Sequence, residues 1–264
     1  MKRNVVFSIT LALAWAALTV GCGSGADTDA DSGVGAGGSA AAPLTIDQAL
    51  AVGDADRAWV EGSLLVLGDQ TRLCSVLAES YPPSCAGSSL VVEGLDAASL
   101  VGLSRTNPDS GVSDASWSDF PVVLSGSLAD GALTVDAPPT PVGEATSGGL
   151  LLRFDHAPRP APASGVVFWL FEITNTSDRE IRLTFGNGQK GEVILSRDGA
   201  EVYRWSADKF FTEAIEELSL VPGGSYGFHL SDPLTLEPGD YDARVFLTAS
   251  DPDLPEVMAV VTLE

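Results

Sequence analysis

The sequence predicts an all-β protein in which a small barrel is followed by an antiparallel sandwich. Three observations support this fold class. Short apolar runs typical of strands recur along the chain, glycine and proline are frequent at 28 and 16 residues, and helical periodicity is scarce. About 220 residues follow the N-terminal segments, which is enough for two small domains.

The first residues have the three-part pattern of a signal peptide. Lys2 and Arg3 form a short cationic segment, and residues 5–20 form an uncharged, mostly apolar run that is too short for an ordinary membrane span. The run ends in LTVGC, which resembles a lipobox, where small residues precede a cysteine that becomes acylated. We therefore predict a lipoprotein signal peptide over residues 1–21 and lipidation of Cys22. The alternative is an ordinary secretory signal followed by a chance cysteine.

Residues 22–43 are dominated by small residues and aspartate and cannot bury a core. We predict that they form a disordered tether between the membrane and the folded part. A multiply acylated cysteine anchors stably because every buried methylene adds to its affinity for the bilayer. The expected location is the cell envelope, on the extracytoplasmic side, with a lipid anchor in the membrane.

The chain is strongly acidic, with 36 Asp and Glu residues against 14 Lys and Arg residues and a formal net charge of -22. Nucleic acids and anionic lipid headgroups require clustered lysines and arginines, so neither is an expected partner. Solubility explains the acidic surface more readily than an acidic recognition patch does.

The three cysteines divide into a lipid site and a pair. With Cys22 assigned to the lipid, Cys74 and Cys85 are expected to form a disulfide, because an even pair in an exported chain is typically oxidised. Closing a loop of this length would stabilise the fold by about 3 kcal/mol. We expect no metal and no cofactor, since the only histidines, His156 and His229, have no Cys or His neighbour at ligand spacing.

Residues 44–138 contain a short helical segment, for which Thr45 is the expected N-cap, and then five strand-like runs. The runs are residues 57–66, 71–74, 89–95, 121–128 and 132–135, and an Asp130–Gly131 turn precedes the last of them. This pattern resembles a small OB-like barrel, which the Cys74–Cys85 disulfide would staple.

OB-like barrels often bind nucleic acids or oligosaccharides. Here Arg57, Arg72 and Arg105 are the only positive charges of the segment, and aromatic residues are few. A nucleic-acid site needs both a basic groove and a stacking platform, so we do not expect one. Tyr81, which two prolines follow, either forms part of a rigid turn or contacts a partner.

Residues 139–147 are proline-rich at their start and are predicted to form a linker. Residues 148–264 then show a clear strand pattern, in which Val167, Trp169 and Phe171 lie on one side of the run 166–173. Further runs are residues 181–185, 191–195, 201–205, 218–221, 226–230, 240–247 and 257–263. Seven or eight regularly spaced strands predict an antiparallel, immunoglobulin-like sandwich.

Six ordered blocks of this second segment resemble the intracellular proteinase inhibitor family of bacilli, the BsuPI domain. They are residues 171–178 (FEITNTSD), 183–189, 198–206, 209–212 (KFFT), 218–223 and 236–241. The resemblance implies a protein partner and inhibition of a serine protease. Because the family's named inhibitor acts inside the cell, an exported chain would have a different target. Gln189 is followed by Lys190 and not by the aromatic–acidic pair often found there.

The resemblance leaves the residues that contact a protease open, and charge suggests candidates. Residues 186–190 and 207–210 are two loops whose lysines, Lys190 and Lys209, would suit a trypsin-like pocket. The alternative function is a non-inhibitory cell-envelope adaptor that docks another surface protein, which a broad apolar patch would indicate.

We do not expect an enzyme, because the sequence lacks a recognisable catalytic set. His156 has a neighbouring aspartate, Asp155, but no nucleophile elbow of the Gly-x-Ser-x-Gly kind occurs. His229 lies within an alternating strand and is expected to pack there.

Overall fold

The computed structural model describes residues 42–106, 111–137, 139–251 and 253–264. The predicted signal peptide, Cys22 and nearly all of the tether lie outside the described residues. The described part is almost entirely β-structure, with one short α-helix, α1 (Ile46–Val52), and one 3₁₀ turn, η1 (Ala97–Ser99). The predicted all-β fold class is therefore confirmed. Within these ranges no helix is long and apolar enough to cross a membrane.

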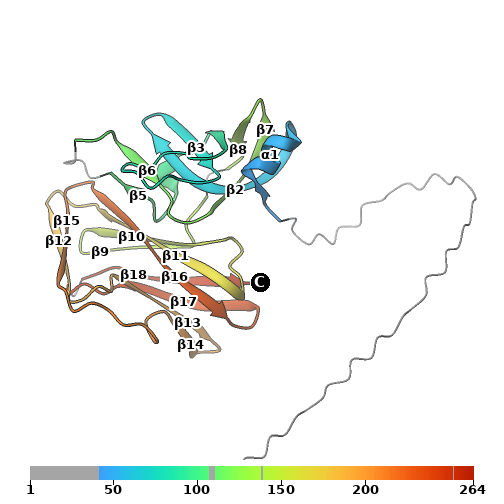
Figure 1. Ribbon diagram of the computed structural model, residues 1–264. Coiled ribbons are helices and arrows are strands. Elements are labelled where there is room, and N and C mark those ends of the chain that lie inside the picture. Colours follow the sequence, from blue (N-terminus) through green and yellow to red (C-terminus); the bar gives the residue numbers. More distant parts are fainter. Residues whose placement is uncertain (1–41, 107–110, 138, 252) are drawn as a thin grey trace, which may run out of the picture. The chain divides into compact units, whose positions relative to one another are not determined.

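Five strands close a barrel in the first half of the described chain (Figure 1). In order around the barrel they are β2 (Ala55–Leu67), β3 (Gln70–Cys74), β4 (Ser89–Glu93), β8 (Ala132–Val135) and β7 (Val122–Ala129), which pairs with β2 again. β4 and β8 run parallel, and the other pairs around the barrel are antiparallel. Three short strands extend this sheet: β1 (Leu44–Thr45), β5 (Ser104–Arg105) and β6 (Ala115–Trp117). The arrangement is that of an OB-like barrel, as predicted.

The barrel closes because apolar side chains alternate along its strands and point to a common interior. The fully buried members of this core include Val60, Leu64, Leu73, Leu90, Leu124 and Leu133. The helix α1 adds Ile46 and Ala49 to the same core. Thr45 caps this helix as predicted: its Oγ1 accepts a hydrogen bond from the Gln48 amide, and its own amide donates to the Gln48 side chain.

Two loops that frame the ligand face of OB barrels are very short here. Gly68 and Asp69 connect β2 to β3, and Asp130 and Gly131 connect β7 to β8. Asp130 and Gly131 have φ angles of 51° and 74°, which is the conformation of a two-residue hairpin turn. Loops of this length add little to the walls of that face of the barrel.

Cys74 and Cys85 form the predicted disulfide, with their Cα atoms 5.4 Å apart. Cys74 is fully buried at the end of β3. The bond holds the segment that follows β3 against the end of that strand. Within this segment the Ala86 amide donates to the Val76 carbonyl.

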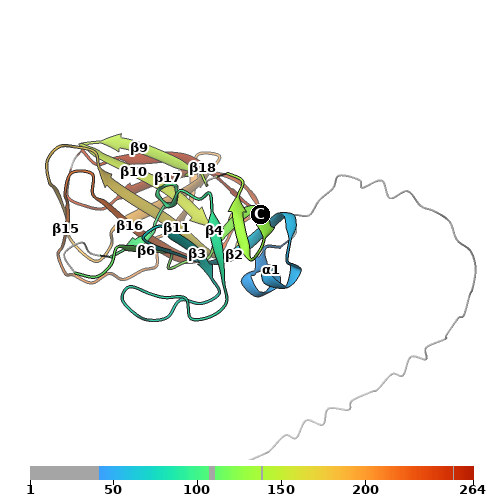
Figure 2. The ribbon, with the colours of Figure 1, turned by 90° about the horizontal axis from the view of Figure 1, so that it is seen from above.

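The sandwich consists of two four-stranded antiparallel sheets. One sheet contains β16 (Ser225–Thr235), β11 (Ser164–Asn175), β10 (Leu150–Ala157) and β9 (Gly143–Ser147), and the other contains β14 (Ala200–Arg204), β13 (Gly191–Arg197), β17 (Gly239–Leu247) and β18 (Glu256–Leu263). β12 (Ile181–Phe185) and β15 (Glu216–Leu220) form a further antiparallel pair. β9 also contacts β18 of the opposite sheet (Figure 2). The predicted sandwich architecture is confirmed.

The structure differs from the predicted linker over residues 139–147. Its second half is β9, which pairs with β10 from Gly143 to Ser147. A Cβ atom at Gly143 would lie 2.6 Å from a methyl group of Val257, so the strand packs closely on β18. The sequence of β9 carries no large apolar residue, and for this reason the strand pattern did not indicate it.

The middle of β11 is buried on both of its faces. Val167, Trp169, Phe171 and Ile173 are fully buried in the sandwich core, on the side that the alternation predicts. On the opposite face Leu170 belongs to the core of the barrel. Residues 42–264 accordingly form one compact unit.

A buried ion pair network joins the barrel to β11. The Glu172 carboxylate is almost fully buried and pairs with Arg105 of β5 at 3.0 Å and with Arg153 of β10 at 3.4 Å. The Arg153 guanidinium also donates to the Ala98 and Ser99 carbonyls of η1, at 2.7 and 2.5 Å. These contacts neutralise a carboxylate that would otherwise be costly to bury.

Close backbone packing reinforces this junction. A Cβ atom at Gly227 of β16 would lie 2.3 Å from the Leu103 carbonyl oxygen of the barrel, so no larger residue fits there. Beside it, the ring of His229 contacts the rings of Phe120 and Phe168, with centroids 5.9 and 5.7 Å apart.

Replacing Glu172 with glutamine should leave two arginines uncompensated at the junction. Removing one partner of a buried ion network is strongly destabilising, and because Arg105 is partly exposed we expect a loss of about 3 kcal/mol of unfolding free energy. Urea unfolding followed by tryptophan fluorescence measures this loss. The control is Glu180→Gln, which removes an exposed ion pair with Arg182 and should not change the midpoint. Equal midpoints for both variants would contradict the role assigned to Glu172.

The two histidines should make the fold sensitive to mild acid. Burial lowers the pKa of His156 and of His229, so the folded state resists protonation. Their stabilising contribution is complete above the unfolded pKa of about 6.5 and is lost as the pH falls through the lowered folded values. Urea midpoints should therefore decrease between pH 7.5 and pH 5. The double variant His156→Gln, His229→Gln should show a smaller decrease, and an equal decrease would rule out this origin.

Candidate functional site

The structure brings together the two loops in which protease contacts were predicted. The Gly188 amide donates to the Thr212 carbonyl at 3.0 Å, which ties residues 186–190 to the segment between β14 and β15. We call this segment, residues 205–215, the contact loop. It leaves an edge strand of the second sheet and has no regular structure beyond a turn at its start.

Both predicted lysines are held in ion pairs. Lys190 Nζ lies 2.6 Å from a carboxylate oxygen of Glu216, and Lys209 Nζ lies 2.6 Å from Asp232 and 3.3 Å from Asp208. Their side chains are 26% and 21% exposed. The protease contacts proposed for these lysines remain a prediction, and any such contact would first have to break these pairs.

The first residues of the contact loop are fixed on the sandwich. Trp205 is buried, its amide donates to the Val193 carbonyl at 3.0 Å, and its indole Nε1 donates to the Ser231 carbonyl at 3.3 Å. Ser206 donates from both its amide and its hydroxyl to the buried carboxylate of Glu192. These bonds set the direction in which the loop leaves β14.

A second anchor lies in the middle of the loop and reaches into the core. The Trp169 indole donates to the Tyr203 hydroxyl at 3.1 Å, and that hydroxyl donates to Asp232 at 3.1 Å. The other oxygen of Asp232 accepts from Lys209. The Lys209 ammonium also lies 5.2 Å from the centroid of the Trp205 ring. Asp232 thereby connects the loop to a buried chain of hydrogen bonds.

Electrostatics keep the two titratable donors of this anchor, Tyr203 and Lys209, protonated. Burial raises the pKa of Tyr203, so its hydroxyl remains a donor to Asp232. Burial lowers the pKa of Lys209, but its hydrogen bonds to Asp232 and Asp208 outweigh that effect and the net pKa is raised. Lys209 therefore stays charged at neutral pH.

Beside the anchor, a partly buried, an exposed and a partly buried residue follow one another at positions 209–211. Lys209 and Phe211 face the sandwich, with the Phe211 ring centroid 5.6 Å from that of Trp205. Phe210 between them is fully exposed, at 102% of its reference surface, and Ile215 is 71% exposed. An anchored loop thus presents two apolar side chains to solvent.

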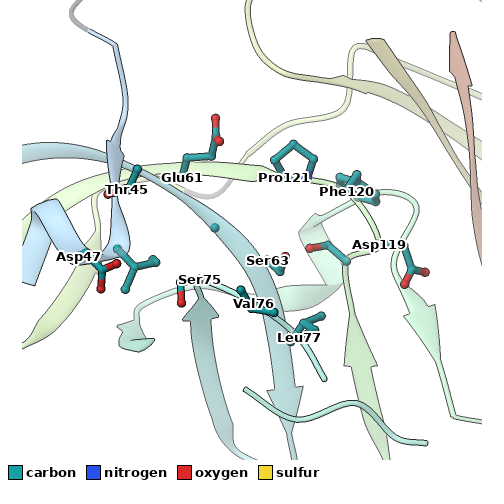
Figure 3. A pocket seen from close by; sticks show the side chains of 13 residues that line it. Thr45, Asp47, Glu61, Ser63, Ser75, Val76, Leu77, Asp119, Phe120 and Pro121 are labelled. Carbon is teal, nitrogen blue, oxygen red and sulfur yellow. The ribbon is translucent and has the colours of Figure 1, made fainter. Parts of the chain in front are cut away.

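A hollow of about 690 Å³ on the barrel lies beside α1 and the start of β7. Its acidic lining residues are Asp47, Glu61 and Asp119, and none of the residues lining it is a lysine or arginine. Figure 3 shows these carboxylates at separate points around the hollow. Within the described residues no group of three His, Cys, Asp or Glu side chains could hold a metal ion.

The two histidines serve packing and local hydrogen bonding. His156 is buried, with its Nδ1 3.0 Å from the Pro158 carbonyl oxygen, beside the ion pair of Asp155 with Arg159. His229 lies among aromatic rings at the barrel junction.

The sandwich is also the part of the chain that is similar to a known protein family. Residues 161–252 match the family model BsuPI, described as an intracellular proteinase inhibitor. The match confirms the resemblance noted in the sequence and contains the contact loop, Lys190 and Asp232. No curated protein matches the chain.

Solved structures give only weak structural similarity. The β-glucosidase from Listeria innocua in complex with glucose has a TM-score of 0.26 and 19% identity, covering 44% of this chain and 16% of that one. A β-glucosidase from Erythrobacter marinus has a TM-score of 0.25 and 14% identity, covering 46% and 16%. The chain therefore spans less than a fifth of either enzyme, and similarity at this level carries no argument about function.

The sequence predicted protease contacts in residues 186–190 and 207–210, and these contacts stay a prediction. The sequence does not indicate Asp232, because this residue lies 23 positions from Lys209 and meets it only through the fold. Phe210 was visible in the matched block KFFT, but the pattern does not say which of its two phenylalanines faces out.

The anchor can be tested by replacing Asp232 with alanine. Losing its charge-assisted hydrogen bonds should cost about 1.5 kcal/mol locally, which corresponds to roughly tenfold faster exchange at the Lys209 amide. Hydrogen–deuterium exchange with mass spectrometry of peptides from the contact loop measures this. Asp208→Ala is the matched control, because Asp208 contacts the same lysine from an exposed position. Similar exchange in both variants would show that Asp232 does not fix the loop.

Proposed function

We propose that this chain is a lipid-anchored extracytoplasmic protein whose sandwich binds a serine protease and inhibits it through the contact loop. The match of residues 161–252 to a proteinase-inhibitor family supports a protein partner of this kind. The observation that carries the proposal is a loop that is exposed at its centre and fixed on either side of it.

A rigid loop favours inhibition, because it can bind a protease tightly and still resist being cut. A loop that is already ordered loses little conformational entropy on binding, and the saving appears as affinity. Pre-organised inhibitors change shape little when they dock. The bonds of Trp205 and Ser206 before Phe210, and of Lys209 and Thr212 beside it, supply such order.

The backbone shape also suits a binding cleft. Residues 209–215 have no strand pairing of their own, and Phe210, Thr212 and Glu213 expose their side chains. Segments outside regular secondary structure can bind a partner through main-chain hydrogen bonds and through exposed side chains that enter pockets. The contact loop offers such side chains, with Phe210 exposed between two residues that are held on the sandwich.

The proposed anchor sets where the target is found. Lipidation of Cys22 and the tether of residues 22–43 would hold the sandwich near the membrane surface. The target would then be an extracytoplasmic protease, in contrast to the intracellular target that the family's description implies.

Inhibition is tested by titrating serine proteases with the mature chain from residue 22, carrying Cys22→Ser so that no lipid is attached. We expect stoichiometric loss of activity of at least one protease, with the inhibitor uncut on denaturing gels. Asp232→Ala should inhibit about tenfold more weakly and be cut faster, whereas Asp208→Ala should match the unmodified chain. Unchanged activity across subtilisin-like, chymotrypsin-like and trypsin-like enzymes would sink the proposal and favour a non-inhibitory adaptor.

A further inference from the structure

We infer, on the basis of the proposed function, that Phe210 is the side chain that enters the primary specificity pocket of the target. The partner is then a protease with a deep apolar pocket, and not one that selects basic residues. This assignment differs from the lysine contacts that charge alone suggests.

Exposure singles out Phe210. Its 102% exposure is the highest among the exposed large apolar residues of the described chain, ahead of Ile215 at 71%. An aromatic ring without packing partners contributes nothing to the fold through burial, yet it can bury a large apolar surface in a complex. Aromatic anchors that fill a partner's pocket dominate binding at many interfaces.

The neighbours of Phe210 hold it outward. Lys209 is drawn toward Asp232 at 2.6 Å, and Phe211 packs against Trp205. Both of these neighbours are partly buried, whereas Phe210 between them is fully exposed. The outward position of Phe210 therefore follows from its anchored neighbours.

The same contacts disfavour the lysines as pocket residues. Lys209 would have to leave Asp232, Asp208 and the face of the Trp205 ring before it could enter a basic-selective pocket. Lys190 would have to leave Glu216 at 2.6 Å. Phe210 breaks no such contact when it binds, so no internal interaction opposes its use.

Pocket chemistry gives a direct test. Trypsin, chymotrypsin and elastase differ mainly in the primary pocket, which is acidic, a deep apolar slot, and small, respectively. The mature Cys22→Ser chain and its Phe210→Ala, Phe210→Lys and Ile215→Ala variants are titrated against these three enzymes and against subtilisin. Circular dichroism and thermal unfolding check that the surface variants remain folded.

We expect the Phe210-intact chain to inhibit chymotrypsin or subtilisin in preference to trypsin and elastase. Phe210→Ala should raise the inhibition constant about 30-fold or more, as loss of a hot-spot residue does. Phe210→Lys should move inhibition toward trypsin, and Ile215→Ala should change the constant less than threefold.

The outcomes separate this inference from the function on which it rests. Inhibition that Phe210→Ala leaves unchanged, or inhibition of trypsin alone that Lys190→Ala or Lys209→Ala abolishes, overturns the role of Phe210 while the inhibitor function stands. Absence of inhibition of all four enzymes by the intact chain removes the inhibitor function, and the assignment of Phe210 falls with it.

Discussion

Strand β11 contributes side chains to the cores of both the sandwich and the barrel, and most of the described structure follows from that constraint. Its inward residues, among them Trp169 and Phe171, complete the sandwich core, while Leu170 completes the core of the barrel. Water cannot solvate a charge on a strand that is buried on both faces, so the Glu172 carboxylate needs cationic partners. Arg105 comes from the barrel and Arg153 from the sandwich, and the two halves pack as one unit.

This packing also determines which part of the sandwich remains available to a partner. The barrel covers the outer face of the sheet that contains β11 and β16, where Gly227 allows the closest backbone approach. The opposite sheet ends in the edge strand β14, and the contact loop extends from it. The core beneath this loop holds Trp205 and Asp232 in place, and these two residues in turn fix the position of the exposed loop.

Alternation in the sequence predicted the inward residues of β11, the five strands that close the barrel and the sandwich strands from β11 to β18, because burial on one face imposes a period of two. It did not indicate the short strands β1, β5 and β6, nor β9 and β10. It missed the second buried face, although the uninterrupted apolar run from Val166 to Phe171 is typical of strands covered on both sides. Parts of the contact loop belong to two of the blocks that resemble the family, residues 198–206 and 209–212. The bond between Lys209 and Asp232 could not be predicted, because it depends on how β16 of one sheet packs against β14 of the other. The sequence also cannot tell which of the adjacent residues Phe210 and Phe211 is exposed, because the backbone conformation decides this.

The most direct test of the central claim is hydrogen–deuterium exchange of the mature chain, alone and saturated with a protease that it inhibits. The account predicts slower exchange on binding in residues 205–215 and in the adjoining residues 186–190, with the barrel unchanged. Protection confined to the barrel or to the outer face of β18, with the contact loop exchanging as in the free protein, would contradict it.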